Sequence, residues 1–165
     1  MTRYFYAGGE RHALELADGP MAIDTRAAAA AGLGDAVAVL PVRSKLPSGV
    51  VLVDRVACTD ELHARLDRAG VIRTVYRSGG AFVVPMPEVR VEFEGDQRGD
   101  AIRALGTSPV PADITEDTPD RLALRPRSGK GDDALDLANH IYEHAHPAAS
   151  TVRMLQVVPK ATTRR

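Results

Sequence analysis

The stretch YRSGGAFVVPMPEVRVEF, residues 76–93, contains the pattern that decides the fold. It opens with a turn at Gly79-Gly80, where two glycines supply the positive φ that a tight hairpin needs. The prolines at positions 85 and 87 keep the next segment extended, because a residue before proline disfavours the helical region. Residues 89–93 then alternate apolar and charged side chains. The stretch therefore predicts a hairpin that leads into a strand with one solvent-facing side.

The same plan occurs about 70 residues earlier, where Tyr6-Ala7-Gly8-Gly9 forms a matching aromatic and glycine turn. After each turn we expect the order β-α-β-β-α-β, which is the ferredoxin-like unit. An offset of this length lies outside the short periods of solenoids and indicates a domain duplication. We therefore predict an α+β fold of two tandem ferredoxin-like units, each preceded by a Gly-Gly β-hairpin, with domains at residues 1–77 and 78–165.

The hydrophobic patterns place the remaining elements. In the first half, Thr59 is expected to cap a helix that Gly70 ends, and Pro41 is expected to stop a continuous apolar strand at residues 36–40. In the second half, Asp132 or Asp133 is expected to cap the best helix of the chain. The expected first-half strands are 4–6, 13–16, 21–23, 36–40, 50–53 and 71–76, with helices at 25–31 and 60–69. The expected second-half strands are 89–93, 110–114, 122–124 and 152–158, with helices at 100–105 and 134–145.

Composition excludes several classes of function. The chain has 165 residues, is 44% hydrophobic with 4% aromatic residues, and has a formal net charge of −1, which does not favour nonspecific nucleic-acid binding. Cys58 is the only cysteine, so neither an internal disulfide nor a thiolate metal cluster is expected. Met1 is followed at once by polar residues, and no stretch resembles a signal peptide or a membrane span. We expect a natural start at Met1, no membrane association and no cofactor. The expected location is cytoplasmic, and secretion is expected only if the chain is excised from a longer precursor.

From Tyr76 to Glu143 the chain resembles the amino-terminal prodomains of bacterial subtilisin-like serine proteases. The resemblance rests on the Gly-Gly turn, the connector VPMPEVRVEF and above all the helix ALDLANHIYE, Ala134–Glu143. The first half looks like the stretch that precedes this domain in longer members. In that family the prodomain resembles a ferredoxin-like fold whose sheet packs on two surface helices of the protease. It templates the folding of the protease and inhibits it, while its extended tail enters the substrate cleft.

The resemblance implies two sets of functional residues. The protease-docking face would be the exposed side of the second sheet, with Arg90, Glu92, Arg121 and Arg125. The tail would be residues 157–165, and the residues expected in the cleft are Val158, Pro159, Lys160, Ala161, Thr162 and Thr163. This chain has VRMLQVVP at residues 152–159, where the family usually has an acidic strand end containing Pro-Asn.

Within these 165 residues, no serine lies on the Gly-rich turn before a helix that a subtilisin-type nucleophile requires. We therefore expect a non-catalytic protease-binding module, an inhibitor and folding chaperone. It is either a prodomain separated from a longer protein or a free-standing relative that acts in trans. The alternative is a structural adaptor or homo-oligomer that uses the same sheets for self-association.

Two other groups of residues could suggest a metal or nucleic-acid site, but each has a simpler structural explanation. His140, His144 and His146 lie near the end of the last helix, where an i, i+4 pair could bind zinc, but cations are also favoured at a helix carboxyl end. Arg121, Arg125, Arg127 and Lys130 form a local basic patch. RNA-binding sheets stack bases on strand aromatics, and these strands offer only Phe93. We therefore expect neither a metal nor a nucleic-acid partner.

Overall fold

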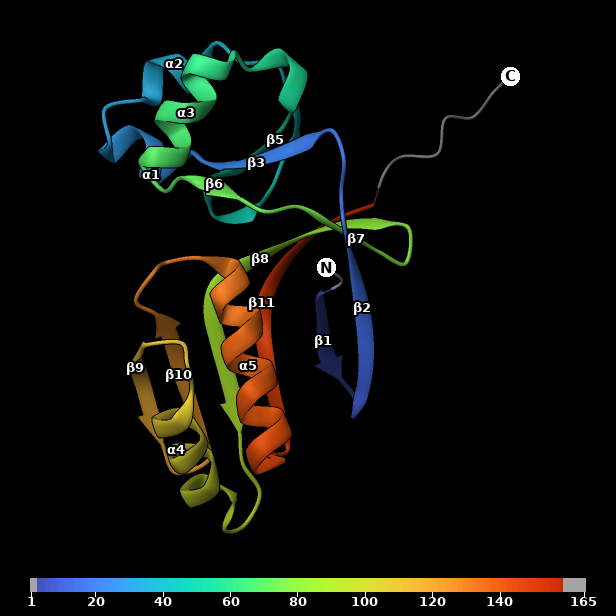
Figure 1. Ribbon diagram of the computed structural model, residues 1–165, viewed down its shortest axis with the longest axis vertical. Coiled ribbons are helices and arrows are strands. Elements are labelled where there is room, and N and C mark those ends of the chain that lie inside the picture. The colour runs from blue at the N-terminus through green and yellow to red at the C-terminus, as the bar shows by residue number, and fades with distance from the viewer. Residues whose placement is uncertain (1–2, 159–165) are drawn as a thin grey trace. The chain divides into compact units, whose positions relative to one another are not determined.

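The computed structural model describes residues 3–158, and they divide into two compact units (Figure 1). Residues 3–14 and 85–154 form one, which we call the α5 unit after its longest helix. Residues 15–84 and 155–158 form the other, which we call the α3 unit. The boundary expected between residues 77 and 78 falls inside strand β7 (Tyr76–Ser78).

The α5 unit is built on a four-stranded sheet with two helices. Its strands lie in the order β11, β8, β10, β9, and β10 runs antiparallel to both of its neighbours. The elements follow along the chain as β8 (Ala81–Glu92), α4 (Gln97–Thr107), β9 (Ala112–Thr118), β10 (Arg121–Pro126), α5 (Gly131–Ala145) and β11 (Ala149–Val157). The unit also contains most of a hairpin formed by β1 (Arg3–Ala7) and β2 (Glu10–Leu16). Gly8 and Gly9 have φ angles of 59° and 79°, as predicted for this turn.

Both helices of the α5 unit lie on the same side of its sheet (Figure 1). Val89, Val91 and Phe93 point to that side, because alternate residues of a strand face opposite ways. The core that they form is almost entirely aliphatic, as the composition predicts. Its buried helical members are Ala101, Ala104, Ala134, Leu137, Ala138 and Ile141.

The prediction that an aspartate caps α5 is wrong. The N-cap residue is Lys130, which makes no side-chain capping bond, and Asp132 and Asp133 lie in the first turn. Acidic side chains are favoured there by the helix dipole, so both aspartates stabilise the helix without capping it. The helix begins at Gly131, which packs against the backbone of Pro85 where no larger residue fits.

The α3 unit contains a second four-stranded sheet, in the order β4, β5, β3, β6. Strand β3 pairs antiparallel with β5 and β6, and β4 pairs antiparallel with β5. Its elements are β3 (Pro20–Asp24), α1 (Thr25–Ala30), α2 (Gly34–Ala38), β4 (Val42–Lys45), β5 (Val50–Asp54), α3 (Asp60–Arg68) and β6 (Ile72–Arg73), with single 3-10 turns at Pro47–Gly49 and Arg55–Ala57. The Oγ1 atom of Thr59 accepts a 3.2 Å hydrogen bond from the Leu62 amide, which confirms the predicted cap of α3. The predicted second hairpin is also present, because β7 pairs with residues 81–83 of β8.

The strand predicted at residues 36–40 is wrong. This segment is helical in α2, and the strand β4 begins only after Pro41. In a strand Val37 and Val39 would share a face, yet Val37 is 5% exposed and Val39 is 81% exposed. Val37 and Leu40, three residues apart, are both buried, as the helical period requires.

The two sheets differ in how much of their surface is covered. Residues 50–53 of β5 are buried on both faces, whereas β8 has exposed residues at every second position from Glu88 to Glu92. The continuous apolar run of β5 and the alternating apolar and charged residues of β8 predict this difference in burial. Among residues 3–158, no helix is long and apolar enough to cross a membrane.

Candidate functional site

The candidate site is the side of the α5-unit sheet that faces away from α4 and α5. We call this side the open face and define it by the exposed or half-buried residues Glu88, Arg90 and Glu92 of β8, Arg121, Ala123 and Arg125 of β10, Thr115 and Glu116 of β9, and Thr151 and Arg153 of β11. The intervening residues Val89, Val91, Leu122 and Leu124 are buried against the helices. The alternation therefore separates a core side from a charged, solvent-facing side.

The four residues predicted for protease docking lie together on this open face. Arg121 pairs with Glu92 in the strand register, and Ala123 pairs with Arg90. Arg125 follows Ala123 by two residues on β10, so it projects to the same side. Sequence alternation alone was enough to place these side chains on one face.

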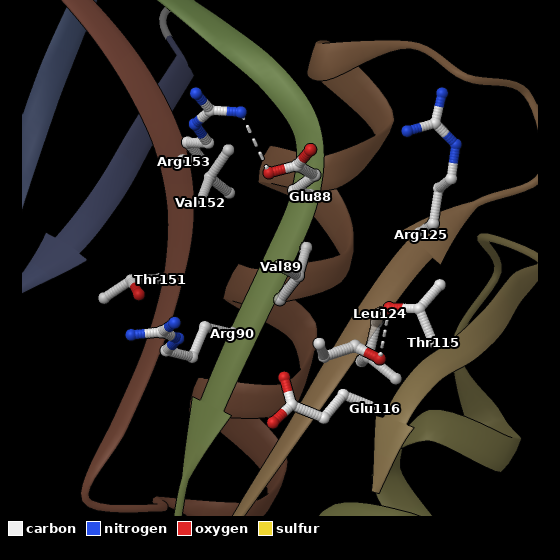
Figure 2. Close-up of a pocket in the computed structure, with 11 residues that line it drawn as sticks. Glu88, Val89, Arg90, Thr115, Glu116, Leu124, Arg125, Thr151, Val152 and Arg153 are labelled. Carbon is white, nitrogen blue, oxygen red and sulfur yellow. Dashed lines mark hydrogen bonds and ion pairs between the residues drawn. The ribbon is translucent and has the colours of Figure 1, made fainter.

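The open face contains a hollow of about 640 Å³ (Figure 2). Ala123 lies at its centre in the strand register, opposite Arg90 on one side and Glu116 on the other. The hollow exists because one methyl group is surrounded by long side chains. Its lining is Glu88, Val89, Arg90, Thr115, Glu116, Ala123, Leu124, Arg125, Thr151, Val152 and Arg153.

Two of the arginines on the open face are held by glutamates. The Nε and Nη2 atoms of Arg121 donate to Oε1 of Glu116 at 3.1 and 2.7 Å. This hydrogen bond and the charge of Glu116 raise the pKa of Arg121. The Nη1 atom of Arg153 lies 3.4 Å from Oε2 of Glu88 (Figure 2). Such exposed pairs contribute little to stability, about 0–1 kcal/mol each, but they fix the directions of the side chains.

Arg90 and Arg125 differ from the other two arginines. Within the part of the chain that the structure describes, neither makes an ion pair or a side-chain hydrogen bond (Figure 2). Their guanidinium groups are therefore the positive charges of this face that remain open to another molecule.

Of the residues expected in the protease cleft, the structure describes only Val158, which is exposed. The predicted residues Pro159, Lys160, Ala161, Thr162 and Thr163 lie outside the described residues.

The three histidines near the end of α5, for which zinc binding was considered from the sequence, do not lie together as one cluster. The rings of His140 and His144 stack with centroids 4.0 Å apart, whereas His146 contacts Tyr142 edge to face. Nε2 of His140 lies 3.1 Å from the Thr107 hydroxyl, and Nδ1 of His144 lies 2.8 Å from the His140 carbonyl oxygen. Over residues 3–158 there is no group of three or more His, Cys, Asp or Glu side chains that could hold a metal ion.

A second, smaller hollow of about 330 Å³ lies between β1 and α5, and no sequence pattern predicted it. There Nδ2 of Asn139 donates to the Tyr4 carbonyl oxygen at 2.8 Å, and the Tyr4 hydroxyl donates to Oε1 of Glu143 at 2.7 Å. That hydrogen bond, followed by burial, raises the pKa of Tyr4. Arg3 and Asp136 form an ion pair at 2.7 Å beside them. These contacts join residues more than a hundred positions apart, so no local pattern could predict them, and they attach the hairpin to α5.

Comparisons with protein-family models, with curated proteins and with solved structures found no match to this chain.

Proposed function

We propose that this chain is a non-catalytic protease-binding module, a prodomain-like inhibitor and folding chaperone of a subtilisin-like serine protease. The single observation that supports this best is the open face of the α5 unit, a sheet surface that is not covered within its own unit. An antiparallel sheet commonly buries one side and leaves the other solvated, and charged groups on such a surface steer and orient a docking partner.

The topology is compatible with the proposal. We infer that both units are ferredoxin-like, since each follows a β-α-β-β-α-β plan, with α1 and α2 together in the first helical position of the α3 unit. In each sheet the first and third strands of the plan lie at the centre, with the second and fourth at the edges. Such folds serve many functions, so the functional argument rests on the open face and on the resemblance of residues 76–143 to the prodomains.

The proposed mechanism has two parts. The open face would pack on the surface of the protease and stabilise its folded state, because a partner that binds only the native form favours folding. The segment after Val158 would enter the substrate cleft in extended form and add main-chain hydrogen bonds to an edge of the enzyme. The proposal assigns no catalytic step to this chain. It also includes the cytoplasmic location expected from the sequence, which immunoblotting of cell fractions would test.

An inhibition and refolding assay tests this function. The purified chain is titrated into a subtilisin-like protease, and the remaining activity is measured with a chromogenic peptide. In parallel, the denatured protease is diluted into buffer with and without the chain. We expect falling activity in the first assay and a higher yield of active enzyme in the second. A protease that stays fully active in excess chain and refolds no better would refute both roles.

The alternative use of the open face is self-association, and light scattering separates the two. The protease-binding role predicts that the chain alone is a monomer at high concentration and forms a heterocomplex with the protease. A dimer that buries the open face and does not bind the protease would favour the adaptor or homo-oligomer function instead.

A further inference from the structure

The backbone of the sheet shapes the hollow around Ala123. In the pairing of β9 with β10, Ala123 pairs with Glu116 and Leu124 pairs with Ile114, so Thr115 is the extra residue of a β-bulge. The Thr115 hydroxyl donates to the Ala123 carbonyl oxygen at 3.2 Å. A bulge redirects the side chains next to it. Here both Thr115 and Glu116 line the hollow beside Ala123. The bulge in the pairing of β9 with β10 therefore helps to shape the hollow.

The charges around the hollow are not equivalent. Arg121 and Arg153 are engaged by Glu116 and Glu88. Arg90 and Arg125 line the same hollow, and within the described residues they make no ion pair. A guanidinium presents its donors in a planar fork that matches a carboxylate in geometry and charge.

We propose that the hollow above Ala123 receives an acidic side chain of the docked protein, attracted by the positive charges of Arg90 and Arg125. This inference deepens the proposed function, on which it rests, and it specifies that the docking surface of the partner is acidic where it meets β8 and β10. A partner helix or loop would place an Asp or Glu over the Ala123 methyl group, and its neighbouring basic groups would face Glu92.

The same face disfavours a polyanion such as RNA. Glu88, Glu92 and Glu116 lie among the arginines and would repel a continuous row of phosphates. The lining of the hollow contains no aromatic side chain on which a base could stack. A single carboxylate on a protein surface of mixed charge carries no row of phosphates for the glutamates to repel, and it needs no aromatic side chain for stacking.

Binding to a protease whose active-site serine has been blocked with phenylmethylsulfonyl fluoride is the first test. Arg90→Glu and Arg125→Glu are each expected to weaken binding by about tenfold or more, with the loss greatest at low salt. Ala123→Gln fills the hollow without a change of charge and is expected to weaken binding to a similar degree. The matched control is Arg103→Glu on α4, which makes the same charge change on the helical side of the unit and is expected to stay within about twofold of the wild-type affinity.

A second probe is independent of any protease. An acetylated hexaglutamate peptide is added to the ¹⁵N-labelled chain at low salt, and the amide resonances are followed by NMR. We expect the resonances of residues 90, 123 and 125 to shift in a saturable way. Arg90→Glu should abolish these shifts, and Arg103→Glu should preserve them.

The protease-binding assay and the hexaglutamate assay together distinguish a failure of this inference from a failure of the proposed function. Protease binding that is insensitive to Arg90→Glu, Arg125→Glu and Ala123→Gln would overturn this inference and leave the proposed function in place. No protease binding, together with saturable hexaglutamate shifts, would refute the proposed function and retain an acidic partner. Absence of hexaglutamate shifts at the open face, or stronger shifts with a hexauridylate RNA, would overturn the inference.

Discussion

Gly131, at the start of α5, packs closely against the backbone of strand β8 of its own unit. It is buried at the first position of the helix, and a Cβ atom there would overlap the carbonyl oxygen of Pro85. The backbone of a strand cannot withdraw as a flexible side chain can. The glycine therefore permits close packing between α5 and β8, and its φ angle is not the reason for its presence.

Replacing Gly131 with alanine should destabilise the protein, because the added methyl group forces α5 away from β8. Overpacking of this kind costs about 1–3 kcal/mol. Gly106→Ala in α4 is the matched control, since a Cβ there meets no atom within 4 Å. Helical propensity makes the control neutral or up to about 1 kcal/mol more stable. Urea unfolding of both variants measures the difference, and equal stabilities would contradict the packing argument.

His140 should make stability depend on pH. Burial, followed by the nearby His144, lowers the pKa of His140 from its ordinary value of 6.5. The folded state then binds fewer protons than the unfolded state, so the free energy of unfolding is highest above the ordinary value and falls as the pH drops through it toward the folded pKa. Titration of the His140 ring by NMR would check this directly. In His144→Asn the pKa of His140 should move upward, and no movement would leave burial as the only cause.

At the scale of elements, β5 and β8 show how burial follows from the sequence pattern. Leu52 of β5 and Arg90 of β8 both point away from the helices of their own units, yet Leu52 is 1% exposed and Arg90 is exposed. The apolar run of residues 50–53 and the alternation of residues 88–92 already encode this contrast.

Truncating these two side chains should therefore have unequal effects. Leu52→Ala is expected to lower the free energy of unfolding by about 2–5 kcal/mol, because it leaves a cavity in a packed interior. Arg90→Ala should change it by less than about 0.5 kcal/mol, as is usual for surface sites. Thermal or urea unfolding compares the two variants. A large loss for Arg90→Ala would mean that the open face has a structural role and not a docking role.

Sequence patterns predicted the longer helices and strands. They failed in a short segment whose residues fit a strand and a helix equally well. The alternation of residues 89–93 located both faces of β8, and Thr59 marked the start of α3. Residues 36–40, AVAVL, fit a strand and a helix equally well, and only the burial of Val37 and Leu40 against the core selected the helix. Alternation also grouped the four residues that were predicted for protease docking. The hollow was not predictable, because it depends on the register between β10 and both neighbours and on a bulge that sequence does not mark.

At the scale of the whole molecule, the two units follow similar plans but have different surfaces. In the α3 unit the residues of β5 are buried on both faces, whereas the α5 unit has an open face with two unengaged arginines. This contrast in surface is the reason for proposing a docking role for only one of the two units. It assigns recognition to the α5 unit, so substitutions that disrupt docking are expected to cluster in β8, β10 and β11.

The proposed division between docking and inhibition can be tested by removing residues 159–165. The open face and the buried Leu155 remain intact, so the free energy of unfolding should change by less than about 0.5 kcal/mol. Binding to a serine-blocked protease should persist through the open face, while inhibition of the active enzyme should fall by more than tenfold, because the extended segment that would occupy the cleft is gone. Full-length Arg90→Glu is the complementary variant, since it keeps the tail and weakens the docking face. Equal inhibition by the truncated and full-length chains would place the inhibitory contacts outside the tail.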